Sequence, residues 1–266
     1  MSGQVFEAKI HREFLREALG AILAISDSGR LNISPEALSV RMTDPANVAL
    51  ISFDLELEAF EVYNFAPPED APDYIQIGVD FQKLASVLAI SSAEFVSISL
   101  KRFGSAKETD QFPEVNLMSL KMDGLSYSLD LFDPSIMRKE PQVPELELPA
   151  KASLFFEDWY KAIRAAEKVG DVVLIKVDES GLVLEVEGES DKLRASFPAS
   201  LLMDFTPAEV TARFALGYLS VLSKAARAAY ASQLWLSLGR DMPIEIQFHI
   251  AEGKGHVVYW LAPRVE

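Results

Sequence analysis

The chain carries the same pattern twice, and this duplication restricts its possible folds more than any other feature. The stretch beginning at Ile77, IGVDFQKLASVLAISSAEFVSISL, aligns without a gap on ALGYLSVLSKAARAAYASQLWLSL, 138 positions later. This alignment places Phe81 on Leu219, and a weaker match at a shift of 144 places Leu15 on Trp159. Self-similarity at a fixed spacing indicates a duplicated structural unit. The 266 residues are therefore expected to form two similar domains.

Both halves show the periodicities of helices lying on antiparallel sheets. Apolar residues at helical spacing predict helices at residues 12–25, 81–88, 157–169 and 217–229. Alternating apolar and polar residues predict strands at residues 5–10, 31–33, 38–42, 48–60, 75–79, 95–100, 115–122 and 124–132, and in the second half at 151–156, 171–177, 182–188, 192–197, 210–216, 233–238, 243–250 and 256–261. Two helices on antiparallel sheets in each half define an α+β fold.

A change of composition at residues 133–149 marks the boundary between the halves. This segment, DPSIMRKEPQVPELELP, contains four prolines and six charged residues. Proline interrupts helices and favours an extended chain. We therefore predict an N-terminal domain at residues 1–132, a connector at 133–149 and a C-terminal domain at 150–266. Residues 102–114, which are polar and turn-rich, are expected to form a long hairpin loop.

Composition argues against several classes of function. The chain has no cysteine, which excludes disulfides, thiolate zinc sites and a cysteine nucleophile. No apolar run approaches the roughly 20 residues that span a bilayer, and the N-terminus lacks the pattern of a signal peptide. An intracellular protein without membrane association is expected.

Catalytic patterns are also weak. His11, His249 and His256 are far apart in sequence, and the GKGH stretch at 253–256 lacks the spacing of a phosphate-binding loop. No G-x-S-x-G elbow occurs, and the many acidic residues show no spacing typical of metal ligands. We expect no enzymatic activity, metal site or cofactor. An acidic hydrolase with paired carboxylates is an alternative that only the surplus of acids favours.

Basic residues recur on the predicted helices although the net charge is −15. A polyanion responds to the local field as well as to the total charge, because distant exposed charges are screened. Cationic helix faces would contact the phosphates of duplex DNA without reading the bases, giving non-specific, salt-dependent binding. An ordinary solvated face is the alternative for any single helix. The candidate DNA-binding residues are Arg12, Arg16, Lys83, Lys161, Arg164, Lys168, Lys224 and Arg227.

Two predicted strands are candidates for exposed sheet edges, at residues 124–132 and 192–197. The alternative is that both are interior strands of hairpins. Exposed edges invite pairing with another chain. Because one edge belongs to each half, such a contact would be head-to-tail, and head-to-tail contacts close into rings when the rotation permits.

In order along the chain, the segments FEAKI, RMTDPANVAL, GVDFQKLASVL, RAAEKVGDVVLIKV, FALGYLSVLSKA and HVVYWLAPRVE resemble the DNA sliding clamps of the proliferating cell nuclear antigen (PCNA) type, found in archaea and eukaryotes. The resemblance covers essentially the whole chain. It implies a ring of three subunits whose helices line a hole for duplex DNA and whose sheets form the outer wall. Such a ring is a processivity factor that tethers DNA polymerase and other replication and repair enzymes.

The resemblance also assigns residues. It implies that the basic residues named above face the channel, with Arg227 added from helical spacing. It places a docking pocket for short peptide motifs of a DNA polymerase, clamp loader, flap endonuclease and ligase beneath the connector. The pocket residues carried over are Thr43, Asn47, Ile136, Pro141, Pro243, Ala262, Pro263 and Arg264.

The chain departs from the family where Ser86, Ala89 and Gly217 occupy positions that are basic in many relatives. The channel is therefore expected to be less cationic than in those relatives. Two alternatives stay open within this reading: a homotrimer, or one subunit of a heterotrimer. A protein-only scaffold without a role on DNA is the alternative from a different class.

Overall fold

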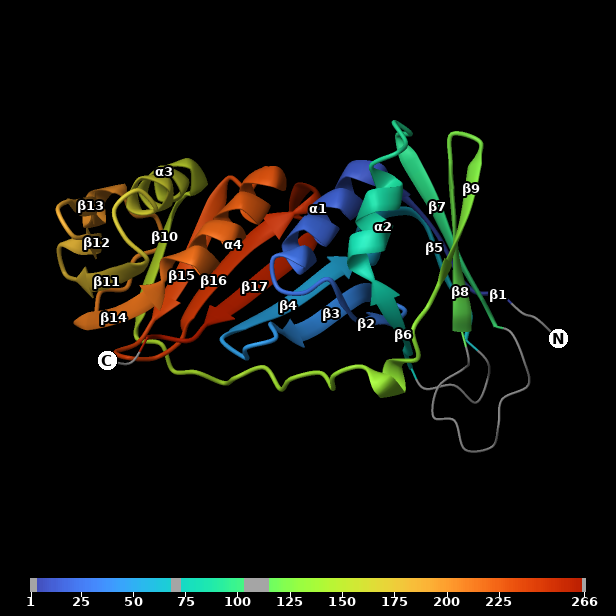
Figure 1. The fold of residues 1–266 in the computed structure, drawn as a ribbon, viewed down its shortest axis with the longest axis horizontal. Coiled ribbons are helices and arrows are strands. Elements are labelled where there is room, and N and C mark those ends of the chain that lie inside the picture. Colours follow the sequence, from blue (N-terminus) through green and yellow to red (C-terminus); the bar gives the residue numbers. More distant parts are fainter. Residues whose placement is uncertain (1–3, 68–72, 103–114, 265–266) are drawn as a thin grey trace. The chain divides into compact units, whose positions relative to one another are not determined.

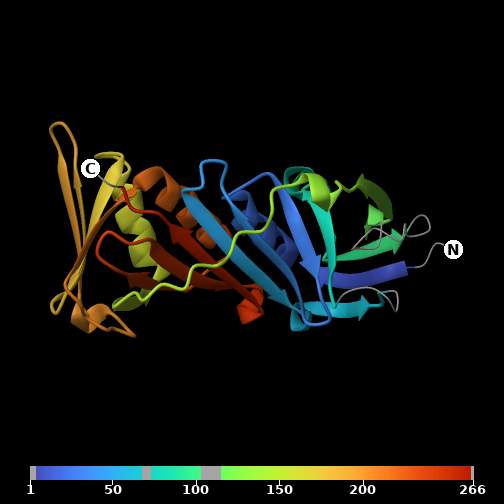
Figure 2. The same ribbon diagram turned by 90° about the horizontal axis from the view of Figure 1, so that it is seen from below.

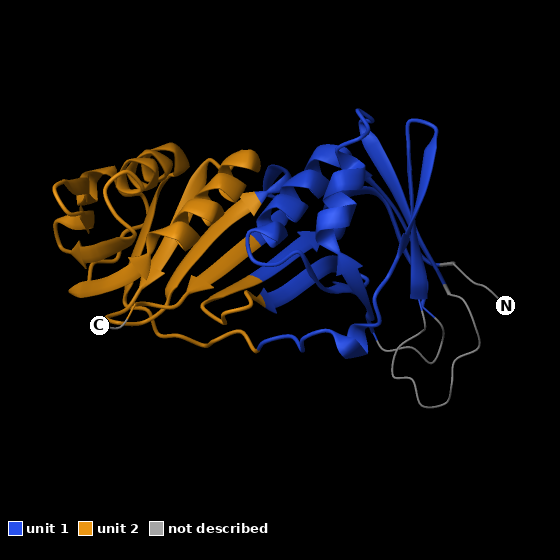
Figure 3. Cartoon of the chain, in the orientation of Figure 1, with its two compact units in different colours: residues 1–42, 52–141, 250–256 blue, residues 43–51, 142–249, 257–266 orange. Residues whose placement is uncertain are grey.

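The computed structural model describes residues 4–67, 73–102 and 115–264 (Figure 1). The predicted loop at 102–114 lies outside these residues except for Arg102. The chain divides into two compact units (Figure 3): unit 1 comprises residues 1–42, 52–141 and 250–256, and unit 2 comprises residues 43–51, 142–249 and 257–266. Short segments of each half thus belong to the other half's unit, and the boundaries predicted from composition stay a prediction.

Unit 1 packs helices α1 (Arg12–Leu23) and α2 (Phe81–Leu88) against each other and against antiparallel strands. One sheet has the order β5-β1-β7-β8-β9, and the strands β4, β3, β2 and β6 follow one another in a second. The strand bounds are β1 Gln4–His11, β2 Ser28–Ile33, β3 Ala37–Thr43, β4 Ala49–Glu56, β5 Phe60–Phe65, β6 Ile75–Asp80, β7 Phe95–Arg102, β8 Val115–Met122 and β9 Leu125–Asp130.

Unit 2 repeats this plan with α3 (Phe156–Ala166) and α4 (Leu216–Ala228). Its strands follow the orders β13-β12-β11-β14 and β10-β15-β16-β17. The strand bounds are β10 Ala150–Phe155, β11 Val172–Asp178, β12 Gly181–Glu187, β13 Lys192–Pro198, β14 Val210–Ala215, β15 Gln233–Leu238, β16 Ile244–Ile250 and β17 Gly255–Leu261. The predicted α+β fold is confirmed.

The spacing of apolar residues predicts the helices correctly because each helix buries one apolar face. On α1 the buried positions include Leu15, Leu19 and Ile22, three or four residues apart. On α3 the fully buried Trp159 donates its indole N–H to Ser223 Oγ of α4 at 3.0 Å, which joins the two helices. The helices end earlier than predicted, α1 at Leu23 and α3 at Ala166.

The internal repeat is confirmed, with one correction to its alignment. The backbone N–H of Arg12 donates to the Glu94 carbonyl and that of Phe156 to the Ser232 carbonyl, each at 2.9 Å, which matches the shifts of 144 and 138. However, α2 and α4 start 135 positions apart, whereas β7 and β15 start 138 apart. The ungapped alignment is therefore wrong at the start of these helices, because α4 is five residues longer than α2 and its following link is two residues shorter.

A strand was missed in the first half. The single run predicted at residues 48–60 is β4, a 3-10 turn at Leu57–Ala59 and the start of β5. Strand β5 lies at the end of its sheet and is only partly covered, so its sequence FEVYNF lacks clear alternation. The hydroxyl of Tyr63 in β5 donates to the Ser34 carbonyl at 2.7 Å.

Both candidate edges are edges among the described strands. Strand β9 ends the order β5-β1-β7-β8-β9, and β13 ends the order β13-β12-β11-β14. Their counterparts in the other repeat are β17 and β4, which are neighbours. Within unit 1 the N–H of Glu56 donates to the Lys254 carbonyl, and within unit 2 that of Ala262 donates to the Val48 carbonyl, each at 2.9 Å.

Candidate nucleic-acid interface and docking surface

Helices α3 and α4 form the helix pair of unit 2 (Figure 1). Their basic side chains are exposed, as predicted. Glu167, at the C-terminal end of α3, brings two of them together: Oε2 lies 2.7 Å from Arg164 Nη1 and Oε1 lies 3.4 Å from Lys224 Nζ. The hydroxyl of Ser220 also donates to Glu167, and this bond, with the two cations, lowers the pKa of the carboxyl group against the effect of burial. Half-exposed ion pairs of this kind contribute little stability, so the cations remain available to a ligand.

The remaining cations of unit 2 also lie at the surface. Arg227 stacks over the ring of Tyr160, 4.5 Å from its centroid, and its Nη1 lies 3.5 Å from Glu157 Oε1. Lys161 Nζ lies 3.8 Å from an oxygen of Asp158, with 72 % of the lysine side chain exposed. Lys168 is exposed, but it follows the end of α3 and lies on a turn. The prediction that it lies on the helix is wrong.

Unit 1 differs from the prediction at one residue. Arg16 and Lys83 are exposed, with Arg16 Nη1 2.9 Å from Glu13 Oε2. Arg12, in contrast, is only 17 % exposed, and its guanidinium donates to the carbonyls of Leu88, Ser91 and Ala93. The expectation that Arg12 presents its charge to solvent is therefore wrong: these carbonyls occupy most of its donors.

The positions noted as departures from the family are exposed in both units. Ser86 and Ala89 lie on or just after α2, and Gly217 lies in the first turn of α4. A neutral residue at each of these exposed positions leaves the helix pair with less positive charge than a basic residue would. The structure thus agrees with a weakly cationic surface.

The turn that carries the predicted docking residues Thr43 and Asn47, residues 43–49 in unit 2 and called the docking turn below, is organised by Asp44, which was not among the predicted site residues. Its carboxylate accepts the backbone N–H groups of Val48, Ala49 and Ala46 at 2.7, 2.8 and 3.1 Å, and the hydroxyl of Tyr218 from α4 at 2.8 Å. Burial raises the pKa of Asp44, but these hydrogen bonds outweigh burial and lower it. An aspartate before proline in a polar turn was the available signal.

Several predicted docking residues gather around this turn. Thr43 Oγ1 donates to Asn47 Oδ1 at 3.1 Å, and Asn47 has a positive φ of 55°. The N–H of Ala262 donates to the Val48 carbonyl at 2.9 Å, so the tail that continues into Pro263 and Arg264 starts beside the turn. Pro243, half-buried, precedes β16 in the same unit.

The start of the connector is fixed in unit 1, where Ile136 and Pro141 lie. Ile136 is 79 % exposed, and Figure 2 shows the connector as an extended segment after the short helical turn Pro134–Ile136. Arg30 holds this segment by donating to the Met137 carbonyl at 2.9 Å. At Gly78 a Cβ atom would lie 2.6 Å from Met137 Sδ and 2.7 Å from the Phe132 carbonyl, so the close approach requires glycine.

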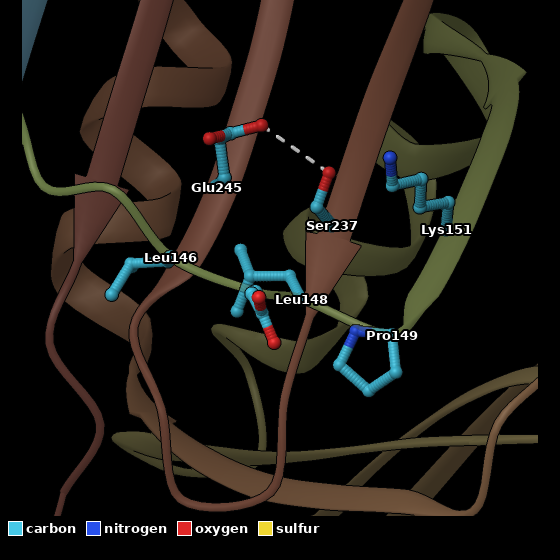
Figure 4. Close-up of a pocket in the computed structure, with 7 residues that line it drawn as sticks. Leu146, Leu148, Pro149, Lys151, Ser237 and Glu245 are labelled. Carbon is cyan, nitrogen blue, oxygen red and sulfur yellow. Dashed lines mark hydrogen bonds between the residues drawn. The ribbon is translucent and has the colours of Figure 1, made fainter.

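The end of the connector forms a pocket of about 510 Å³ with the strands of unit 2 (Figure 4). Leu146, Leu148 and Pro149 cross the sheet face that carries Ser237 and Glu245. Glu245 accepts the hydroxyl of Ser237 at 3.2 Å and the indole N–H of Trp260 at 3.0 Å. These bonds fix the indole of Trp260, two residues before the predicted docking residue Ala262.

Among the described residues, no group of three or more His, Asp or Glu side chains is arranged to hold a metal ion. None of the described helices is long and apolar enough to cross a membrane.

No protein-family model matches the chain. Across 98 % of its length the chain is 38 % identical to the DNA polymerase sliding clamp of Methanosarcina barkeri and 35 % identical to that of Methanococcoides burtonii, covering 99 % of each. The chain belongs to the DNA polymerase sliding clamp family. The resemblance stated from the sequence is thereby confirmed.

Solved structures agree with this assignment. The structure of A. fulgidus PCNA with the C-terminal region of FEN-1 bound matches this clamp with a TM-score of 0.84 at 30 % identity, covering 98 % of this chain and 99 % of that one. PCNA from Entamoeba histolytica, 21 % identical, shares the fold with a TM-score of 0.80 over 99 % of this chain and 100 % of that one. The sliding-clamp fold predicted from the sequence is confirmed.

Proposed function

We propose that this sliding clamp encircles duplex DNA as a ring and tethers DNA polymerase to it, acting by binding and without catalysis. The observation that carries the proposal is the exposure of cations on both helix pairs in a clamp-family chain of net charge −15. Exposed cations on the helices attract phosphates, while the net negative charge of the rest of the chain repels nucleic acid. An intracellular location follows from this function, and in an archaeon it would be cytoplasmic and nucleoid-associated.

The repeat supports ring closure. Strands β17 and β4 are neighbours, and their counterparts β9 and β13 are edges among the described strands. If the same pairing is used between chains, β9 of one chain meets β13 of the next, head to tail. Three chains of two repeats would then form the trimeric ring. Native mass measurement of the purified chain separates a homotrimer from a subunit that requires sister chains.

The docking turn, in unit 2, and the start of the connector, in unit 1, are each proposed to bind partner motifs. An exposed apolar side chain such as Ile136 and a proline-rich extended connector fit a short peptide with apolar anchors. We propose the clamp loader, flap endonuclease and ligase as further partners at these sites. The FEN-1 segment bound to A. fulgidus PCNA supports this class of partner.

The test is primer extension on primed circular DNA, at a salt concentration where the polymerase alone is not processive. Addition of the clamp is expected to lengthen the products. The double variant Lys161→Glu/Arg164→Glu should lose most of this effect, whereas Lys101→Glu/Lys121→Glu, with the same change of charge on exposed sheet positions, should retain it. Equal product lengths with and without the wild-type clamp would refute the function. Equal activity of the two double variants would indicate a protein-only scaffold.

A further inference from the structure

Arg12 is bound to the end of α2 and to the link between α2 and β7, residues 89–94, and its side chain is only 17 % exposed. Its Nη1 donates to the Ser91 carbonyl at 2.7 Å and to the Leu88 carbonyl at 3.4 Å, and its Nε donates to the Ala93 carbonyl at 3.0 Å. The remaining nitrogen, Nη2, lies 2.6 Å from Glu13. One guanidinium thus fixes the end of α2 and the link that precedes β7 to the first residue of α1.

The same link is bonded to the hairpin that carries the edge strand β9. Ser91 is buried, and its hydroxyl accepts the N–H of Ala93 at 3.0 Å and donates to Asp123 Oδ2 at 2.8 Å. Asp123 and Gly124 form the two-residue turn between β8 and β9, with φ of 47° and 75°, as a type I′ hairpin requires. Hydrogen bonds therefore run without interruption from Arg12 to the turn that starts β9.

The second repeat provides an internal comparison. Phe156 occupies the position of Arg12 and makes the equivalent backbone bond, but its side chain is buried in the apolar core. The hairpin of that repeat ends in β17, which is a neighbour of β4. Of the two equivalent hairpins, β8–β9 and β16–β17, the one that ends in an edge among the described strands is the one joined to an arginine at this position. The difference between the repeats points to a role at the edge.

We propose that Arg12 is a positioning residue for assembly: it holds the β8–β9 hairpin against the helix pair so that β9 can pair with the edge strand β13 of a second copy of this chain. The proposal rests on the ring of the proposed function. Arginine suits this role because its planar group supplies several donors in fixed directions, whereas lysine supplies a single flexible ammonium group. A lysine at this position would preserve a contact with phosphate far better than it would preserve these hydrogen bonds to several carbonyls.

The test compares Arg12→Lys with Arg16→Lys, a matched change one turn along the same helix. Amide hydrogen exchange is followed on the chain diluted until it is monomeric. In Arg12→Lys, exchange is expected to accelerate roughly tenfold or more in residues 88–94 and 123–130, because bonds to several carbonyls are lost together. Arg16→Lys should leave both segments unchanged. Equal exchange in the two variants would overturn the proposal.

Assembly is measured separately, by sedimentation over a range of concentrations. The Arg12→Lys chain should require about tenfold more protein to assemble, while duplex binding of the assembled form keeps its salt dependence. Ser91→Ala, which cuts the link to Asp123 and spares the arginine's own bonds, should weaken assembly as well, and it serves if the Arg12 variant fails to fold. A wild-type chain that never assembles would overturn the proposed ring and this role together. A wild type that assembles no better than either folded variant would overturn the assembly role alone.

Discussion

Removal of the Asp44 carboxylate should dismantle the docking turn, and the size of the effect follows from its bonds. The residue Asp44 is 5 % exposed, and its carboxylate accepts three backbone N–H groups and one tyrosine hydroxyl. A hydrogen bond to a charged group contributes about 1.5–3 kcal/mol, and a buried donor without a partner costs about 1–3 kcal/mol. Because the four bonds share one acceptor group and are not additive, we expect Asp44→Ala to cost about 3–5 kcal/mol of unfolding free energy.

Two milder variants test the reasoning step by step. Tyr218→Phe removes one bond and should cost about 1–2 kcal/mol. Asp44→Asn keeps one acceptor oxygen but sets an NH₂ group against donors, so its cost should fall between those of the other two variants. In a double-mutant cycle, the Tyr218→Phe cost should shrink when Asp44 is already asparagine. Denaturant unfolding at one fixed chain concentration measures these values, because assembly contributes to apparent stability.

The pH dependence of the same bond network has a definite sign. Folding lowers the pKa of Asp44 from its ordinary value of 3.8, so the charged form is favoured in the folded chain. The stability it contributes is therefore fully present above pH 3.8 and is lost as the pH falls through the lower folded-state pKa.

Binding of a docking peptide should weaken in Asp44→Ala while duplex binding is retained. Unfolding free energies in which Tyr218→Phe costs more than Asp44→Ala would refute the assignment of Asp44 as organiser.

Three further variants have expected outcomes. Gly78→Ala should cost about 1–3 kcal/mol, because its Cβ would overlap Met137, and limited proteolysis should then cleave the start of the connector faster. Trp159→Phe should cost about 2–4 kcal/mol in thermal unfolding, because it leaves a cavity and removes the bond to Ser223. Glu167→Gln should tighten duplex binding and steepen its salt dependence, since it frees two neighbouring cations, and a salt titration that shows weaker binding would contradict this.

The fold was predictable because its dominant signals are local and repeated. Buried positions on α1 follow helical spacing, and central strands such as β8 alternate clearly between buried and exposed positions. The prediction failed where a strand is only partly buried or where equivalent helices differ in length between the repeats. The edge strand β5 has no clean alternation, and the extra turn of α4 preserves the apolar spacing, so an ungapped alignment looks correct although the helices start 135 positions apart.

The site was predictable only as a set of residue types at helical positions. Spacing placed Arg164 and Lys224 on exposed faces, and the structure adds that Glu167 joins them. Spacing could not show that Arg12 is occupied by three carbonyls, because these lie about 80 residues away in sequence. The role of Tyr218 depends on Asp44, 174 positions away, and no local sequence pattern predicts such a pair.

The corrected repeat explains how one helix position came to serve two purposes. With helix starts 135 apart, Lys83 of α2 corresponds to Tyr218 of α4. Lys83 is exposed, as a phosphate contact must be, whereas the hydroxyl of Tyr218 turns to the buried carboxylate of Asp44. Exchanging the two residue types is therefore expected to disturb the fold at only one of the two positions. Tyr218→Lys removes the hydroxyl that Asp44 accepts, whereas Lys83→Tyr removes one exposed cation and leaves the fold intact. Duplication supplied the same backbone twice, and the neighbours of each copy decide what its side chain does.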